Sequence, residues 1–323
     1  FVDFMAIIRQ QNPEGVPLYY ILVYGWAKWI GTSGTAARWF SVTLHGAAAW
    51  ALYRAGTALA GRRAGMTAAL WFACSPSQVW HGQSVRPYPL VTLLACLMLW
   101  SLILCMRGAD RGKRFAVPAG LAALALLPWT HLTTLVLLPA LLTGWVLSGS
   151  PISPLRKRKK LKIPAILLVC WIPLVYWVLH LPMVSALAYS MYHPPDGLRS
   201  LFAVVAPDAP QRMGEVLAGS PELWDPWLPH MVLLRDRLEW LLAAVGLGAI
   251  IVTGRRAFRK TASEGGPGVS SALRMIWVTA LLPPVMLIVL SYIWRPCFMP
   301  RYLTASIPAL YLLIGTAAAL LPR

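Results

Sequence analysis

Charge is scarce in this chain, and acidic residues are the scarcest kind. Charged residues make up only 12% of the chain and hydrophobic residues 58%, whereas a soluble globular domain carries about 25% charge. The five cysteines form no CxxC pair and stand mostly inside apolar runs, which argues against a zinc site or a disulfide framework. The repeated apolar stretches, apolar on all sides, indicate a polytopic helical membrane protein.

The basic residues outnumber the acidic ones and give a net charge of +18, which first suggests a nucleic-acid ligand. More than half of the 29 Lys and Arg, however, fall in four short loops near residues 62–63, 107–114, 156–162 and 255–260. These loops follow every second apolar run, which is typical of cytoplasmic loops that face anionic lipid. We therefore expect them on the cytoplasmic side, and no nucleic-acid partner.

The apolar runs predict an all-α transmembrane bundle with about nine spans. The spans cover about residues 36–60, 64–80, 88–106, 115–130, 132–148, 163–181, 238–254, 273–293 and 302–321. Residues 16–30 are apolar and aromatic, but as a helix they are only about 22 Å long. A juxtamembrane helix therefore fits them better than a span.

The chain divides into four predicted parts. Residues 1–35 complete a first extracytoplasmic loop, 36–181 form a first helix group, 182–237 a long proline-rich extracytoplasmic loop, and 238–323 a C-terminal helix group. An extracytoplasmic N-terminus without a targeting signal is physically unusual, so we expect an N-terminally truncated piece of a longer protein with a further helix upstream.

Polar and aromatic residues gather in the turns on the predicted outer side. The candidates are His81, Gln83, Arg86, Tyr88, His131, Arg295, Arg301 and Tyr302. Guanidinium groups stay charged and bind phosphate oxygens in bidentate geometry, so we expect Arg86 and Arg301 to hold a lipid phosphate, with Tyr88 and Gln83 orienting sugar or phosphate. The alternative is that these residues only anchor helix ends. No metal-ligand spacing and no glycine-rich phosphate loop is present in the sequence, so no cofactor is expected.

The two histidines of this set, His81 and His131, could assist proton transfer or bind phosphate. The alternative is that each is a hydrogen-bonded structural group. If the ligand of these turns is a sugar that is transferred to an acceptor, the reaction needs a carboxylate to deprotonate the acceptor hydroxyl. Asp3, just ahead of the short interfacial helix, is the candidate base, or else a solvated terminal residue.

Five short motifs, in order along the chain, resemble those of the membrane-integral GT-C glycosyltransferases. They are GVPLYYIL at 15–22, ARWFS at 37–41, GRRAG at 61–65, SP followed by QSVRPY within 75–88, and RP to PRYL within 295–303. The similar families are dolichyl-phosphate-mannose-protein mannosyltransferase-like, aminoarabinose-transferase-like and RgtA/B/C/D-like proteins. Ser84 stands where these families have a carboxylate, whereas Arg86 and Tyr88 match.

The resemblance implies a glycosyltransferase that moves a sugar from a polyprenyl-phosphate donor to an acceptor protein, lipid or glycan. It implies an integral protein of a bacterial inner (plasma) membrane with its active site on the extracytoplasmic side, and it adds Tyr19 to the substrate-binding candidates. A transporter or flippase of lipid-linked sugars is the alternative. That alternative predicts ionisable groups in mid-membrane and an internal repeat; His45 and Arg54 lie within a span, but we find no repeat.

Overall fold

The computed structural model describes residues 16–108, 113–148, 171–173, 241, 244–257, 268–293 and 300–321, and every regular element in them is a helix. The labelled elements are α2 (Leu18–Ile30), α3 (Gly34–Ala60), α4 (Arg62–Cys74), α5 (Pro76–Gln83), α6 (Tyr88–Arg107), α7 (Lys113–Thr130), the 3-10 helix η1 (Leu132–Val136), α8 (Leu137–Ser148), α15 (Val269–Ile293), the 3-10 helix η4 (Pro300–Ala305) and α16 (Ile307–Leu320). Residues 244–257 are also helical. The all-α prediction is confirmed for this part of the chain.

Two of the described helices, α6 and α15, are long and apolar enough to cross a membrane. A span needs about 20 apolar residues, and α7, η1 with α8, and α16 are shorter apolar helices. By length and composition, two of the described helices could therefore span a membrane, and the number of nine spans stays a prediction. The span predicted at 163–181 lies almost entirely outside the described residues.

The apolar run at 64–80 is not one helix, as the sequence had suggested. It breaks after Cys74, and a separate short helix, α5, begins at Pro76. Ser75 adopts an extended conformation, and its Oγ accepts a hydrogen bond of 3.3 Å from the backbone N–H of Gln78. A proline disfavours helical geometry in the residue before it and fits the first position of a new helix, so the Ser-Pro pair ends one helix and starts the next.

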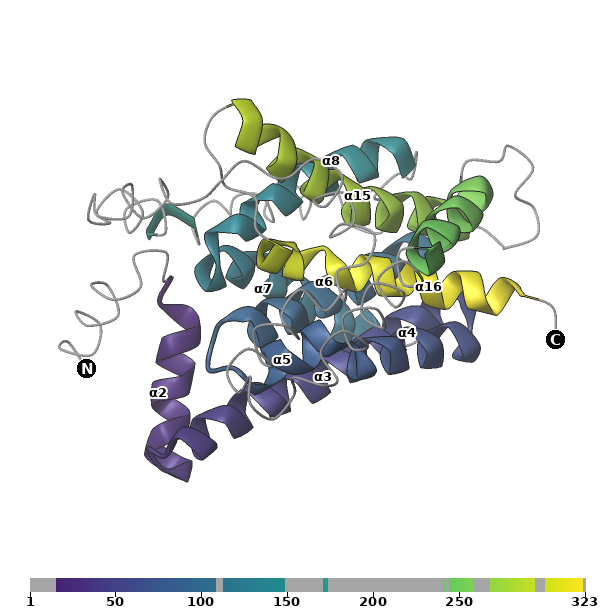
Figure 1. The fold of residues 1–323 in the computed structure, drawn as a ribbon. Helices are drawn as coiled ribbons and strands as arrows, with labels where there is room; N and C mark the ends of the chain where they lie inside the picture. Colours follow the sequence, from purple (N-terminus) through teal and green to yellow (C-terminus); the bar gives the residue numbers. More distant parts are fainter. Residues whose placement is uncertain are drawn as a thin grey trace, which may run out of the picture.

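Helix α2 lies across the direction in which α3 runs (Figure 1). It has 13 residues, too few to span a hydrocarbon layer of about 30 Å. Gly31, with φ 118°, ends it, and Ser33 begins α3 by accepting a hydrogen bond of 3.1 Å from Ala36 N–H. The positive φ suits glycine, which has no Cβ to clash there.

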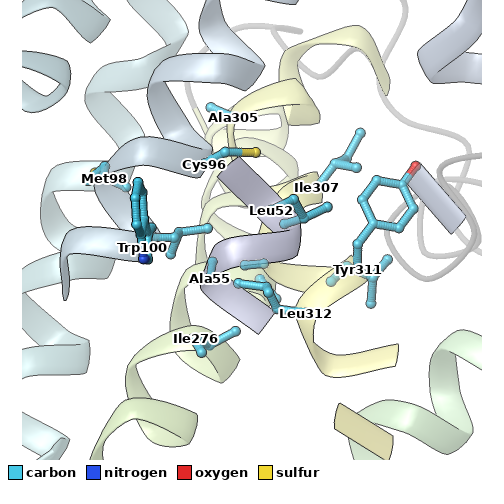
Figure 2. Packing of buried hydrophobic residues seen from close by; sticks show 14 of the residues in the cluster. Leu52, Ala55, Cys96, Met98, Trp100, Ile276, Ala305, Ile307, Tyr311 and Leu312 are labelled. Carbon is cyan, nitrogen blue, oxygen red and sulfur yellow. The ribbon is translucent and has the colours of Figure 1, made fainter. Parts of the chain in front are cut away.

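The core lies where α3, α4, α6 and α16 pack together. Figure 2 shows part of it, with labelled side chains from α3, α6, α15 and α16. Leu52 and Ala55 of α3 are fully buried there, as are Tyr311 and Leu312 of α16. Small residues let the helix backbones touch: a Cβ added to Gly56 of α3 would lie 2.8 Å from the Cα of Gly65 in α4. A Cβ added to Gly315 of α16 would likewise meet the backbone of α4.

Basic side chains from separate loops lie at one end of the bundle. The Arg63 guanidinium at the start of α4 donates a hydrogen bond of 3.2 Å to the carbonyl of Leu321, just after α16. Arg107, at the end of α6, donates one of 3.2 Å to the carbonyl of Leu59 near the end of α3. We call this the basic end. The chain ends of α4, α6 and α16 that are far from it form the opposite end.

Candidate functional site

Four rings from four separate segments form a row at the end opposite the basic end. They are His81 of α5, Tyr88 at the start of α6, His131 between α7 and η1, and Tyr302 of η4. Successive ring centroids are 4.7, 5.8 and 5.4 Å apart, which is the range of direct aromatic contact. All four side chains are buried. We call these four residues the ring row.

The segment between α5 and α6 holds the first two members of the ring row in contact. The hydroxyl of Ser84 donates a hydrogen bond of 2.9 Å to the carbonyl of His81 and so closes the last turn of α5. Pro87, with φ −66°, already has helical geometry and begins α6 directly before Tyr88. Because proline fixes this dihedral angle, the chain enters α6 at a defined position.

His131 occupies its position because it caps η1. Its Nδ1 accepts a hydrogen bond of 3.3 Å from the backbone N–H of Thr133, and the Thr133 hydroxyl lies 2.8 Å from the same nitrogen. A ring nitrogen that accepts a backbone N–H carries no proton, so the neutral ring has its proton on Nε2. This capping contact therefore sets the tautomer that the ring row presents.

Arg86 and Gln83 lie at the rim of the ring row and are exposed. Arg86 stands two residues before Tyr88 in the connection to α6, and it makes no hydrogen bond or ion pair with any described residue. Arg301 lies in η4 next to Tyr302, but its side chain is outside the description. Asp3 and Arg295 also lie outside the described residues.

Tyr19 is not part of the ring row. It is buried in α2, where its hydroxyl is 2.9 Å from the Ser41 hydroxyl and its ring packs 5.9 Å from that of Phe40. Burial raises the pKa of Tyr19 to about 12, and the hydrogen bond with Ser41 opposes part of this rise. Its contacts join α2 to α3, so the structure shows a packing role, and its predicted contact with substrate stays a prediction.

Further polar side chains lie buried or half-buried on and beside α5, the helix that carries His81. Of these, the sequence had drawn attention to His45, but not to Gln78. Ser75 Oγ accepts hydrogen bonds from the Tyr311 hydroxyl, at 3.0 Å, and from the backbone N–H of Gln78. The ring of His45 stacks on Phe72 with centroids 4.4 Å apart. The available signal was the spacing of Gln78 and His81, because residues three apart share one face of a helix.

The arrangement can hold a polar ligand at one end of an apolar bundle. The ring row offers two imidazoles and two phenols, and its rim offers a guanidinium at Arg86. Charge-assisted hydrogen bonds from a guanidinium to phosphate are about twice as strong as hydrogen bonds between neutral groups. In the described part of the chain, no group of three or more His, Cys, Asp or Glu residues could hold a metal ion.

Comparison with known proteins gives one family. No curated protein and no solved structure matches the chain significantly. The model of the dolichyl-phosphate-mannose-protein mannosyltransferase family matches residues 13–177, a range that includes three of the four residues of the ring row. Because this match covers just over half of the sequence, the chain belongs to the dolichyl-phosphate-mannose-protein mannosyltransferase family, a family of GT-C membrane glycosyltransferases.

Proposed function

We propose that this glycosyltransferase moves a sugar from a polyprenyl-phosphate donor to a hydroxyl of its acceptor, at the end of the bundle that holds the ring row. The observation that carries the proposal is the convergence of His81, Tyr88, His131 and Tyr302 on one site. Family membership supports a lipid-linked sugar as donor. The family's description makes mannose the first sugar to test and a protein the first acceptor.

The residues divide between the two halves of the reaction. Transfer breaks the bond between the sugar's C1 and the phosphate oxygen, so negative charge grows on the departing phosphate. Arg86 at the rim and the Nε2–H of His131 are donors that would stabilise this charge. Arg301 and Arg295 are further candidates for the same phosphate, and Asp3 for the base that takes the acceptor proton.

The distribution of charge supports an extracytoplasmic site. Arg63 and Arg107 contact carbonyls at the basic end, and excess basic charge marks the cytoplasmic side of membrane proteins. The ring row lies at the other end, so we place it at the extracytoplasmic face. Polyprenyl chains of the donor would lie in the hydrocarbon layer, with the phosphate at the level of Arg86.

The alternative function, a flippase of lipid-linked sugars, predicts ionisable groups within the membrane that serve transport. Arg54 in α3 lies over the rings of Trp50 and Trp100, at 5.6 and 5.1 Å from their centroids. These cation–π contacts give the charge a structural partner, so Arg54 does not require a transport role.

The test uses the complete protein in liposomes with radiolabelled polyprenyl-phosphate mannose and a candidate acceptor. Label on the acceptor is the expected result. Donor that crosses the bilayer without any labelled product would instead establish the flippase. A panel of polyprenyl-phosphate donors with other sugars, run in parallel, identifies the sugar when mannose gives no product.

A further inference from the structure

Two buried nitrogen atoms next to the ring row lack a hydrogen-bond partner within the described structure. They are Nε2 of Gln78 and Nε2 of His45. Gln78 is only 1% exposed, so water outside the bundle does not reach its carboxamide. Buried polar groups in native proteins nearly always have a partner, and each one left without it lowers stability. Two such atoms in one region indicate that a group outside the chain completes them.

Both residues belong to the contact between α5 and α3. Gly82 of α5 packs on the imidazole of His45: a Cβ added there would lie 3.1 Å from His45 Cγ. Gln78 precedes Gly82 by one helical turn and therefore lies on the same face of α5. His81 lies on that face too and contacts Tyr88. One face of α5 thus carries Gln78, the glycine that packs on His45, and a member of the ring row.

The surrounding side chains hold both groups in place without satisfying them. The ring of His45 is stacked on Phe72, with 24° between the planes. The Ser75 hydroxyl already accepts hydrogen bonds from the backbone N–H of Gln78 and from the hydroxyl of Tyr311, and it makes no hydrogen bond to Gln78 Nε2. These neighbours therefore leave Gln78 Nε2 and His45 Nε2 without a hydrogen-bond partner in the described structure.

The chemistry of the pair selects a neutral hydroxyl. A carboxamide N–H donates, and His45 Nε2 accepts when the neutral ring carries its proton on Nδ1. In that tautomer a single hydroxyl group can accept from Gln78 and donate to His45. Neither group carries a fixed charge, and a phosphate would fit the guanidinium of Arg86 better. We propose that Gln78 and His45 form a hydroxyl-binding subsite of the transferase. This rests on the proposed function, and the hydroxyl belongs either to the donor sugar or to the acceptor.

The test compares variants that keep size but remove the polar atoms. Gln78→Met and His45→Phe retain volume, and the phenyl ring retains the stack on Phe72. Without substrate, both should be at least as thermally stable as the wild type, because a buried unpaired group is gone. With substrate, KM should rise about tenfold, because one hydrogen bond to a buried hydroxyl is lost. The double variant should show less than the sum of the two effects, since both residues hold one group.

Thr57→Val is the matched control. Thr57 Oγ1 is also a buried atom without a partner among the described residues, but it lies at the contact of α3 with Gly65 in α4, near the basic end. Its replacement should change thermal stability in the same direction as the other two variants and leave KM unchanged. A rise in KM for Thr57→Val would show that the loss of any buried polar atom disturbs the enzyme, which would overturn the assignment.

The source of the hydroxyl follows from which KM changes. If the variants raise the KM only for polyprenyl-phosphate mannose, the hydroxyl belongs to the donor sugar. Wild type and variants should then have the same KM for the one deoxymannose donor that lacks this hydroxyl. A rise only for the acceptor assigns the acceptor. Unchanged KM for both substrates, with increased stability of the variants, means that a buried water molecule alone fills the site and overturns the proposal.

A binding measurement keeps this test separate from the proposed function. The thermal stabilisation of the detergent-purified complete protein by polyprenyl-phosphate mannose is compared with that by sugar-free polyprenyl phosphate. For a donor-sugar hydroxyl, the extra stabilisation by the sugar should vanish in Gln78→Met and His45→Phe. If the wild type binds the donor but transfers no sugar, the proposed function fails, while loss of the extra stabilisation in the variants still supports the subsite. Equal extra stabilisation of wild type and variants excludes a donor-sugar hydroxyl, and together with an unchanged KM for the acceptor it overturns the subsite.

Discussion

The hydroxyl of Tyr311 donates a hydrogen bond of 3.0 Å to the hydroxyl of Ser75, and this bond joins α16 to the junction between α4 and α5. The ring of Tyr311 also meets Phe72 edge-on, with centroids 5.8 Å apart. Ser75 is the residue that caps α5, the helix that carries Gln78 and His81. The C-terminal helix therefore helps to position the helix on which the candidate site depends.

Tyr311→Phe should lower the free energy of unfolding by about 1 kcal/mol, because a buried hydrogen bond is lost while the ring remains. Ser75→Ala should cost more, since it removes both this bond and the cap of α5. Melting temperatures of the purified proteins in detergent measure both effects. An equal or smaller loss for Ser75→Ala would contradict the double role of Ser75.

Arg86→Ala should reduce kcat/KM more than about tenfold, because a charged donor to phosphate is lost. Thermal stability should not change, since the side chain is exposed. Arg86→Lys should recover part of the activity, because lysine keeps the charge but not the bidentate geometry. Arg62→Ala, an exposed arginine at the basic end, is the control and should transfer sugar normally. Near-normal activity of Arg86→Ala would rule out the phosphate contact.

Two replacements of His131 separate its capping contact from its place in the ring row. Asparagine can cap η1 but removes the ring, whereas phenylalanine keeps a ring but removes both nitrogens. If Nε2–H stabilises the departing phosphate, both variants should lower kcat about 100-fold. Sugar-transfer assays at saturating donor provide the comparison. An active His131→Asn protein would show that the residue serves only to cap η1.

Gly65→Ala should destabilise the bundle by about 1–3 kcal/mol, the usual cost of an overpacked helix contact. Its new methyl group would meet the carbonyl of Tyr53 and the hydroxyl of Thr57 in α3. Gly46→Ala in the same α3 is the control, because nothing lies within 4 Å of the added Cβ and alanine favours a helix by about 1 kcal/mol. Thermal unfolding in detergent should separate the two variants in opposite directions.

The hydrogen-bonded phenol of Tyr19 should make stability depend on pH in the alkaline range. Its pKa is about 12 in the folded protein and 10.0 for an ordinary tyrosine, so the folded state holds the proton more tightly. This contribution is complete below pH 10 and is lost as the pH rises from 10 to 12. Tyr19→Phe lacks a titrating group there. The stability difference between wild type and variant should therefore shrink over that interval, measured by thermal unfolding at each pH.

Long apolar runs predicted the individual helices well, because an apolar segment in lipid must satisfy its backbone hydrogen bonds internally. The predicted span 88–106 corresponds to α6, which ends one residue later. The run at 64–80 was misjudged, since composition outweighed the Ser75-Pro76 signal that divides it into α4 and α5.

The site itself was only partly predictable. The sequence indicated the four residues of the ring row separately, because they lie in different turns. No local pattern in the sequence shows that their rings form a single row. Gln78 was passed over because an uncharged residue inside an apolar run carries no electrostatic signal. Its importance depends on burial and on a missing partner, and both are properties of the packed structure.

The ring row draws its last member from a part of the chain that the ribosome makes late. Three of its residues lie within the family-matched range 13–177, whereas Tyr302 comes from η4. During synthesis the earlier helices enter the membrane first. His131 therefore lacks its contact with Tyr302 until η4 has been made. A chain that stops before η4 would therefore retain the range matched by the family but lack Tyr302. Under the proposed function, such a chain should transfer no sugar.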